Sequence, residues 1–227
     1  MQKRYTNNCI LAFGDTHGPY QHKQTLKFLA AVKNSFPIDR VVHMGDLLDM
    51  YSVSDYPKDL NHPDTWKDEF KKGRQFVKAL GELFPKMELL SSNHDDRAYK
   101  KSRVAGVPRE LLIPYLKAVN APEGWKLHKQ LSLTVDYDRS QWLFSHTFNM
   151  SPIDAAKALN KSICVGHNHT KFGMTAFHNG DKLVWGVDCG CLISDEGHPY
   201  KYNKLQISRP ILGCTIIQNG EPRLISL

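Results

Sequence analysis

Five short segments of the chain end in residues that could bind a metal ion. In each segment an apolar run leads to a small residue, and a carboxylate, amide or imidazole side chain follows directly. The segments are residues 12–17, 41–49, 89–95, 142–146 and 163–169. An apolar run that ends at a turn residue is typical of a buried strand. We therefore interpret the five segments as strand ends that bring their polar side chains to one site.

The candidate ligands comprise two carboxylates, one amide and four imidazoles. They are Asp15, His17, Asp46, Asn93, His146, His167 and His169. Alternate side chains of an extended segment point the same way, so each pair two residues apart can address one site. This donor set suits Mn, Fe, Zn, Co or Ni, with manganese the first choice, because calcium prefers oxygen ligands alone. Two such ions carry more positive charge than the two aspartates neutralise. The remaining positive charge would hold an anionic phosphate and lower the pKa of a water shared by the ions.

Other interpretations of the histidines exist. A lone histidine is more often a core or surface residue than a ligand, and six are interpreted in that way: His22, His43, His62, His128, His178 and His198. His94-Asp95 alone could indicate an HD-type helical hydrolase, but an apolar strand-like run precedes it. His167-x-His169 alone could indicate a metallo-β-lactamase or an amidohydrolase. The former needs further Asp-His ligands directly afterwards, and the latter needs the pair on its first strand.

The motifs resemble a known family when they are taken in order. Asp15-x-His17, Gly45-Asp46-x-x-Asp49, Asn93-His94-Asp95, His146 and Gly166-His167-x-His169 are similar, as a set, to the motifs of the calcineurin-like metallophosphoesterase superfamily. The resemblance implies an α/β fold, a four-layer α/β-β/α sandwich in which two mixed sheets lie face to face with helices outside. It also implies a centre of two divalent ions at the strand ends.

The resemblance also assigns roles by position. One ion would take Asp15, His17, Asp46 and His169, and the other would take Asp46, Asn93, His146 and His167, so that Asp46 bridges them. His94 matches the residue that protonates the leaving group or steadies the transition state. The hypothesis is hydrolysis of a phosphate monoester or diester, in which a hydroxide bridging the ions attacks phosphorus and His94 assists the departing oxygen. Arg97 would reach the phosphate or the leaving group, or else pair with a neighbouring aspartate.

The chain departs from the family pattern at three places. Ser92 and Ser145 stand where the family usually has glycine, and we expect altered loop geometry there and no loss of metal. Met50-Tyr51 follow Asp49, where the Ser/Thr protein phosphatases of the superfamily carry Arg-Gly, which argues against a protein phosphatase. The compact size is more similar to stand-alone enzymes often carried by bacterial viruses.

Two rival functions follow from charge and fold. The net charge is +7 with a pI near 9.1, which favours phosphate-rich substrates or nucleic acid. The basic run 97–103, with Lys71, Lys72 and Arg74, would indicate a nuclease or cyclic-nucleotide phosphodiesterase if it lined the cleft, and solvated helix faces are the alternative. A non-catalytic binding module supported by metal is a rival of another class, although no expected ligand is missing.

Composition favours one globular unit. The chain has 227 residues, 41% of them hydrophobic, which suits a single domain over residues 1–227. No apolar run is long enough to cross a bilayer, and no secretory signal is evident, so we expect a cytoplasmic protein. Five cysteines indicate reduced, mostly buried thiols, and Cys189-Gly190-Cys191 lacks a second pair for a structural zinc site. The sequence gives no indication of oligomeric state.

Apolar periodicity predicts the elements that carry these residues. Strands are expected over 9–13, 40–44, 87–90, 131–135, 141–144, 163–165, 171–177, 183–187, 211–217 and 222–225. Helices are expected over 22–32, 66–83, 96–117 with a break at Gly106-Val107-Pro108, and 152–159. Residues 51–64 are expected to form a loop over the strand ends. The first three strands alternate with helices, which is typical of a parallel sheet.

Overall fold

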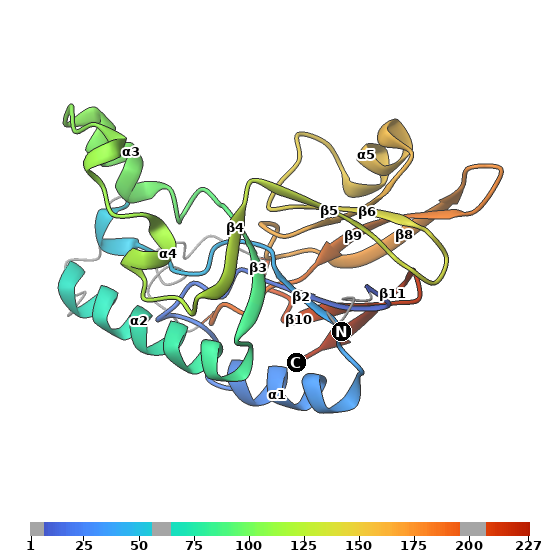
Figure 1. The fold of residues 1–227 in the computed structure, drawn as a ribbon, viewed down its shortest axis with the longest axis horizontal. Coiled ribbons are helices and arrows are strands. Elements are labelled where there is room, and N and C mark those ends of the chain that lie inside the picture. Colours follow the sequence, from blue (N-terminus) through green and yellow to red (C-terminus); the bar gives the residue numbers. More distant parts are fainter. Residues whose placement is uncertain (1–6, 56–64, 196–207) are drawn as a thin grey trace, which may run out of the picture.

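The computed structural model describes residues 7–55, 65–195 and 208–227, which form two mixed β-sheets and the helices that cover them (Figure 1). The first sheet has the strand order β11-β10-β1-β2-β3-β4. Its strands are β1 (Cys9–Phe13), β2 (Arg40–His43), β3 (Lys86–Leu90), β4 (Gly124–His128), β10 (Gly213–Gln218) and β11 (Glu221–Ser226). Strands β1 to β4 run parallel, and β10 and β11 add antiparallel strands beside β1.

The second sheet has the strand order β5-β6-β7-β9-β8. Its strands are β5 (Gln130–Thr134), β6 (Gln141–Ser145), β7 (Ser162–Val165), β8 (Phe172–His178) and β9 (Leu183–Cys189). The central strands β6, β7 and β9 are parallel, and the edge strands β5 and β8 pair antiparallel. Both sheets therefore have parallel strands whose carboxyl ends gather along one edge.

Helices cover the outer face of each sheet. Helices α1 (Thr25–Ser35) and α2 (Trp66–Leu83) lie below the first sheet in Figure 1, and α5 (Pro152–Leu159) lies above the second. A separate arm contains α3 (Arg97–Val104), the 3-10 turn η2 (Arg109–Leu111) and α4 (Tyr115–Ala118), and it stands to the left of the sheets. A further 3-10 turn, η1 (Tyr51–Val53), follows β2.

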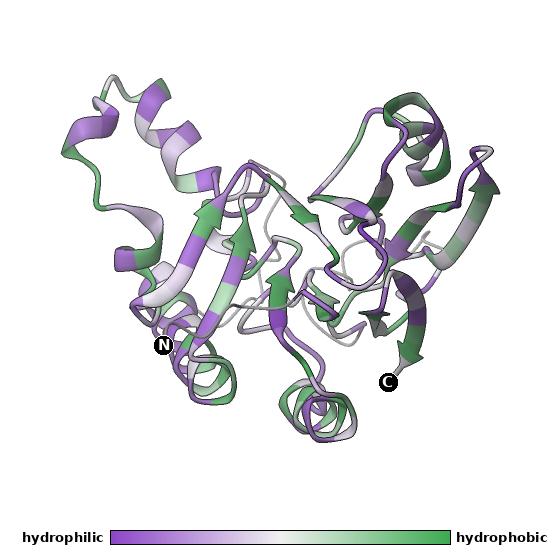
Figure 2. Cartoon of the chain, turned by 45° about the vertical axis from the view of Figure 1, so that its right-hand side comes forward, coloured by the Kyte–Doolittle hydropathy of each residue, from purple (hydrophilic) through white to green (hydrophobic). Residues whose placement is uncertain are grey.

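The alternation of side chains along β1 divides the core into layers. Leu11 and Phe13 pack in one cluster with residues of α1 and α2, whereas Ile10 and Ala12 pack in another with Trp142 of the second sheet. A third cluster joins α5 to β7 and β9. Successive residues of a strand point to opposite faces, so one apolar run serves both layers. Strands and helices alike carry both hydrophobic and hydrophilic residues in Figure 2. The predicted four-layer α/β-β/α architecture is confirmed.

Helix α2 spans the predicted residues 66–83, and its sequence caps the start. Thr65 Oγ1 accepts a hydrogen bond from the Asp68 backbone N–H at 3.3 Å, and the Asp68 carboxylate accepts one from the Thr65 N–H at 3.0 Å. Such a reciprocal capping box satisfies two backbone donors at a helix start. On the inner side of the same turn, buried Glu69 accepts the N–H groups of Tyr51 and Ser52 at 2.6 and 2.8 Å. These contacts fix the segment that follows β2.

Four features of the structure differ from the predicted elements. Strand β4 was not predicted, because Trp125 is its one buried residue and the rest of the strand lacks an apolar alternation. The predicted helix 96–117 is divided into α3, η2 and α4, and Gly106 adopts a φ of 74° at the break. The first helix begins at Thr25, three residues later than predicted. Of the predicted loop 51–64, η1 occupies the start, and residues 56–64 lie outside the described residues.

The cysteine prediction is confirmed, since all five thiols are free and buried. No helix among the described residues has the length and apolar character needed to cross a membrane.

Candidate metal centre

The seven predicted ligands come together where the central strands end. Asp15 follows β1, Asp46 follows β2, Asn93 follows β3, His146 follows β6 and His167 follows β7. Because these strands are parallel within each sheet, their carboxyl ends meet along one edge of the sandwich. Ligand atoms of six of the seven residues fall into two groups that share Asp46, with the atoms of each group within 4.8 Å of one another.

The first group contains Asp15, His17, Asp46 and His169. His17 Nε2 lies 3.1 Å from His169 Nε2 and 3.4 Å from Asp46 Oδ2. His169 Nε2 lies 3.3 Å from Asp15 Oδ1. Two imidazole nitrogens and two carboxylates therefore point at one small volume, as predicted from the motif positions.

The second group contains Asp46, His146 and His167, and Asn93 adjoins it. His146 Nε2 lies 3.4 Å from Asp46 Oδ1, 3.2 Å from His167 Nδ1 and 2.9 Å from Asn93 Oδ1. Asp46 thus turns Oδ2 toward the first group and Oδ1 toward the second. A bridging carboxylate would be disposed in the same way.

One oxygen of the buried Asp46 carboxylate has no hydrogen-bond donor among the described residues. Asp46 is 1% exposed, and its Oδ2 atom accepts no hydrogen bond from any described residue. A buried anionic oxygen without a partner is costly, and a divalent cation beside it removes that cost. Together with the converging imidazole nitrogens, this oxygen shows that the residues present fit a divalent metal ion.

The backbone is strained at four of the candidate ligands. Asp15, His17, Asp46 and His167 have φ values of 49°, 48°, 50° and 69°. Residues other than glycine rarely adopt positive φ, and the cost is of order 1–3 kcal/mol each. Such conformations persist where the surrounding structure enforces them, often at functional sites. The conformations turn the side chains off the strand ends and into the cluster.

Two glycines let the chain approach the cluster closely. Gly45 has a φ of 102°, and a Cβ atom there would lie 2.8 Å from His146 Nδ1. A Cβ atom at Gly166 would lie 2.6 Å from Asp15 Oδ2. Any larger residue at either position would displace a candidate ligand, so the glycines of both motifs have a steric reason.

Hydrogen bonds behind the cluster orient two of the imidazoles. His17 Nδ1 donates to Asp49 Oδ2 at 2.9 Å, and His146 Nδ1 donates to the Met44 carbonyl at 2.9 Å. A proton held on Nδ1 leaves Nε2 as the ligating nitrogen, and such partners raise its basicity. Asp49 belongs to the Gly45 motif but was not among the predicted site residues. Its spacing of three residues after Asp46 is the signal that could have identified it.

The charged forms of the aspartates and histidines in the cluster stabilise one another. Burial favours the neutral form of Asp46, but the charges of His17, His94 and His146 hold its pKa below the usual value. Burial likewise opposes ionisation of Asp15, and the hydrogen bond and charge of His169 nevertheless lower its pKa. Burial lowers the pKa of His17, but the Asp49 hydrogen bond and the surrounding carboxylates raise it to about 9. The protein groups alone thus favour positive charge at this position.

His94 and Arg97 lie together at the rim of the cluster. His94 Nδ1 donates to the Asp49 carbonyl at 2.7 Å, and Arg97 donates to His94 Nε2 at 3.0 Å. Arg97 also donates to the Asp49 carbonyl at 2.8 Å and lies 3.6 Å from its carboxylate, so its aspartate partner is Asp49. Burial and the charge of His17 lower the pKa of His94 to about 4. His94 is therefore neutral near pH 7.

The two serines that replace family glycines both have partners. Ser92 Oγ donates to buried Asp95 at 2.7 Å, and Ser145 Oγ donates to the Thr147 carbonyl at 3.0 Å. Each serine hydroxyl thus has a hydrogen-bond acceptor close to it in sequence, next to a candidate ligand. The ligands on either side still converge.

Comparisons with known proteins give structural neighbours only. No family model and no curated protein matches the chain. Solved structures with a related fold include Vacuolar Protein Sorting 29 from Cryptosporidium parvum, which is 14% identical, with 97% of this chain and 96% of that chain covered and a TM-score of 0.42. A metallophosphoesterase from Sphaerobacter thermophilus is 12% identical, with coverages of 96% and 87% and a TM-score of 0.48. The Pseudomonas putida nuclease MPE is 14% identical, with coverages of 95% and 87% and a TM-score of 0.37.

One of these neighbours is named a metallophosphoesterase and another a nuclease, but all three TM-scores lie below 0.5, so the likenesses carry no argument about this chain. Identities of 12–14% carry no argument about activity. The function has to be argued from the side chains of this chain.

Proposed function

We propose that this chain is a hydrolase of phosphate esters that depends on two divalent metal ions. The observation that supports it best is Asp46, which is buried, has an oxygen without a hydrogen-bond partner and turns one oxygen to each group of imidazoles. Asp15, His17 and His169 would complete one ion's ligands, and Asn93, His146 and His167 those of the other. When bound, the ions would supply positive charge for a phosphoryl group and acidify a water. Manganese remains the first metal to test.

The protein groups at the rim have roles of their own in this proposal. His94 can assist the departing oxygen only if Nε2 is released by Arg97 and carries a proton. An anionic phosphate ester would attract the Arg97 guanidinium away from His94 and would raise the His94 pKa. Arg97 would then hold a phosphoryl oxygen, and the Asp49 carbonyl would keep the His94 ring oriented through Nδ1.

The test is metal-dependent hydrolysis. Protein stripped with a chelator is reloaded with manganese, iron, zinc, cobalt or nickel, and bound metal is counted while hydrolysis of p-nitrophenyl phosphate and bis(p-nitrophenyl) phosphate is followed. We expect two ions per chain and turnover of at least one ester. Asp55→Asn is the matched control, because Asp55 is 84% exposed and pairs with Lys101 away from the cluster. Two bound ions with no hydrolysis of either ester would contradict the proposal and favour a non-catalytic binding module.

A nuclease or cyclic-nucleotide phosphodiesterase is the second candidate. The net charge of +7 favours it, and a basic groove described below gives the charge a location. Preference for the diester over the monoester, followed by cleavage of single-stranded DNA or a cyclic nucleotide, would distinguish it from a phosphomonoesterase. A single domain in the cytoplasm, where free thiols stay reduced, remains part of the proposal.

A further inference from the structure

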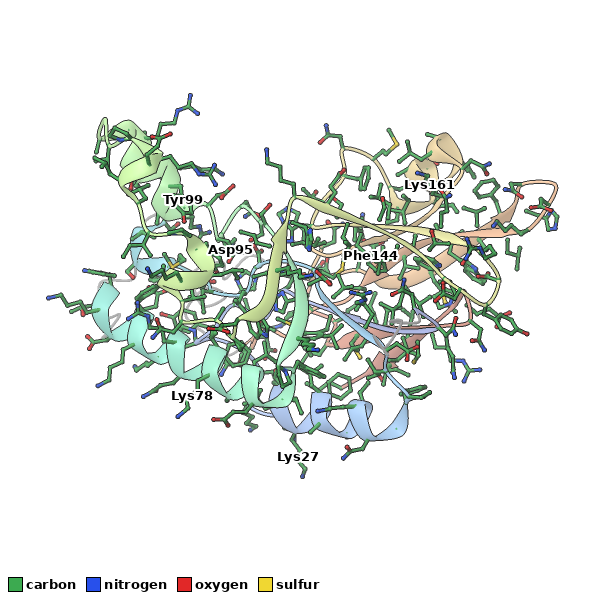
Figure 3. The ribbon with its side chains drawn as sticks, viewed as in Figure 1. Lys27, Lys78, Asp95, Tyr99, Phe144 and Lys161 are labelled. Atoms are coloured by element: carbon green, nitrogen blue, oxygen red, sulfur yellow. The ribbon has the colours of Figure 1, made fainter. Side chains whose placement is uncertain are left out.

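The outer surface of α2 carries a groove with basic and aromatic walls. The groove has a volume of about 670 Å³ and lies between α2 and Asn120, which follows α4. Its walls include Trp66, Lys67, Phe70, Lys71, Arg74 and Lys78, and we call it the α2 groove. Lys78 extends from α2 away from the sheets in Figure 3. No candidate metal ligand lines this groove, so the proposed catalytic site does not account for it.

The aromatic wall consists of Trp66, which is exposed, and Phe70, which is partly buried against the core. Trp66 is 53% exposed, whereas Trp125 and Trp142 are 3% and 0% exposed. The Trp66 and Phe70 ring centroids are 5.8 Å apart, with their planes 42° from each other. The two rings stand about one helical turn apart. The Trp66 indole is exposed at the surface, whereas the Arg74 guanidinium lies over the Phe70 ring.

The basic wall carries charge that no carboxylate within the groove neutralises. Arg74 donates through Nε to the Ala118 carbonyl at 2.8 Å, and its guanidinium carbon lies 4.6 Å from the centre of the Phe70 ring. Both partners hold the guanidinium in place. Because both are uncharged, they do not neutralise its positive charge. Among the described residues that line the groove, none is acidic. Lys67 and Lys71 are exposed beside it.

We propose that the α2 groove binds single-stranded nucleic acid, with phosphates along Lys67, Lys71 and Arg74 and a base stacked on Trp66. A basic track with interleaved aromatic faces is the chemistry that single strands need, because every base offers a π face. An acidic peptide could use the lysines but would gain little from the indole. A duplex would hide its bases from the indole. The proposal deepens the proposed function and rests on it, because a strand held here would be the phosphodiester supplied to the metal centre.

The groove and the cluster are connected through one helical turn. Glu69 lies between Phe70 and Trp66 in sequence and binds Tyr51 and Ser52 on the inner side of α2. Those two residues directly follow Met50, the neighbour of Asp49. The two faces of the helix are separated by about one helix diameter, ~10–12 Å. A strand seated on the outer face would thus be separated by about one helix diameter from the segment that leads to the candidate metal site.

The test measures binding of fluorescein-labelled oligothymidylate by anisotropy, with chelator present so that no cleavage occurs. Trp66→Ala should weaken binding roughly 5- to 150-fold, the range for loss of base stacking, and Trp66→Phe should retain most of it. Lys67→Gln with Lys71→Gln should reduce the slope of log affinity against log salt by about 1.4. Lys23→Gln with Lys27→Gln changes the charge equally outside the groove and should leave both quantities unchanged. Lys23 precedes α1, and Lys27 lies in its first turn (Figure 3).

Each outcome has one meaning. Equal affinity and salt slope for wild type and all groove variants would overturn the inference, as would an equal Trp66→Ala effect on duplex DNA. Tighter binding of polyglutamate or of phosphatidylserine vesicles than of oligothymidylate would also overturn it, in favour of an acidic peptide or a lipid surface. Hydrolysis of bis(p-nitrophenyl) phosphate by the wild-type protein tests the metal centre separately. If the wild-type protein does not hydrolyse this ester but binds oligothymidylate through Trp66, the proposed function is contradicted and the inference about the α2 groove still stands.

Discussion

Replacement of Asp49 by asparagine tests the orientation of the first metal group without removing a candidate ligand. The asparagine keeps the size of the side chain but replaces the carboxylate that accepts from His17 Nδ1 at 2.9 Å. Asp49 is 1% exposed, so water cannot substitute freely for the lost partner. Loss of a carboxylate behind a ligating histidine typically costs 10- to 100-fold in metal affinity, about 1.4–2.7 kcal/mol. We expect manganese binding to weaken within that range.

The same variant should change the pH dependence of metal binding. The Asp49 hydrogen bond and the nearby carboxylates raise the His17 pKa to about 9 against the effect of burial. A metal at His17 Nε2 must displace a proton below that pH, so wild-type affinity should rise about tenfold per pH unit towards pH 9. Asp49→Asn removes the main raising cause, and its affinity should level off at lower pH. The deficit of the variant should therefore widen as the pH rises.

Folding stability should follow the same titration in protein without metal. Because the folded-state pKa of His17 is raised, the stabilisation is complete below its usual value of 6.5 and is lost as the pH rises through about 9. Asp49→Asn should flatten this decline. Thermal unfolding in chelator at several pH values measures it directly.

Metal affinity is measured by calorimetric titration of the metal-free protein with Mn²⁺ at about pH 7 and about pH 8.5. Asp55→Asn serves as control, since an exposed ion pair is worth little. If Asp49→Asn binds manganese as tightly as wild type at the higher pH, the oriented imidazole contributes nothing and the reasoning is refuted.

The other predictions concern single side chains. Asp46→Asn removes the shared carboxylate, and metal analysis should find fewer than two ions per chain and no hydrolysis. His94→Ala should keep both ions and lower turnover by ~100-fold or more, and full turnover on a poorly activated ester would contradict its role. Gly45→Ala puts a Cβ atom 2.8 Å from His146 at a φ of 102°, and a cost of ~2 kcal/mol should lower the Tm by ~4–8 °C. Glu69→Ala leaves two backbone donors unpaired, and ~1–3 kcal/mol should be lost in denaturant unfolding.

The candidate ligands could be predicted because their chemistry follows directly on apolar runs. Asp15, Asp46 and His167 each come within three residues of a strand end, and parallel strands bring such positions to one edge. Helix α2 was predicted to the residue from a capping residue at its start and an apolar periodicity along its length, and Thr65 caps it in the structure together with Asp68. Local signals of this kind need no knowledge of distant contacts.

Features that depend on distant contacts could not be predicted. Strand β4 forms because β3 offers it a partner, and its exposed residues carry no pattern. The pairing of Arg97 with His94 Nε2 and Asp49 depends on where η1 and α3 meet. The predicted basic residues lie in two places, since Arg74 lines the α2 groove whereas Arg97, from the run 97–103, lies at the rim of the cluster.

The strained backbone and the missing hydrogen bond at Asp46 have one physical origin. Left-handed φ at Asp15, His17, Asp46 and His167 is unfavourable for each residue, and burial of Asp46 Oδ2 without a donor is unfavourable again. These costs are all concentrated at one point and are opposed by packing on both sides, since Leu47 and Met44 are 0% exposed. The strained residues and the unpaired oxygen lie at the same strand ends. A cation bound by Asp46 would therefore stabilise all the strand ends that meet there.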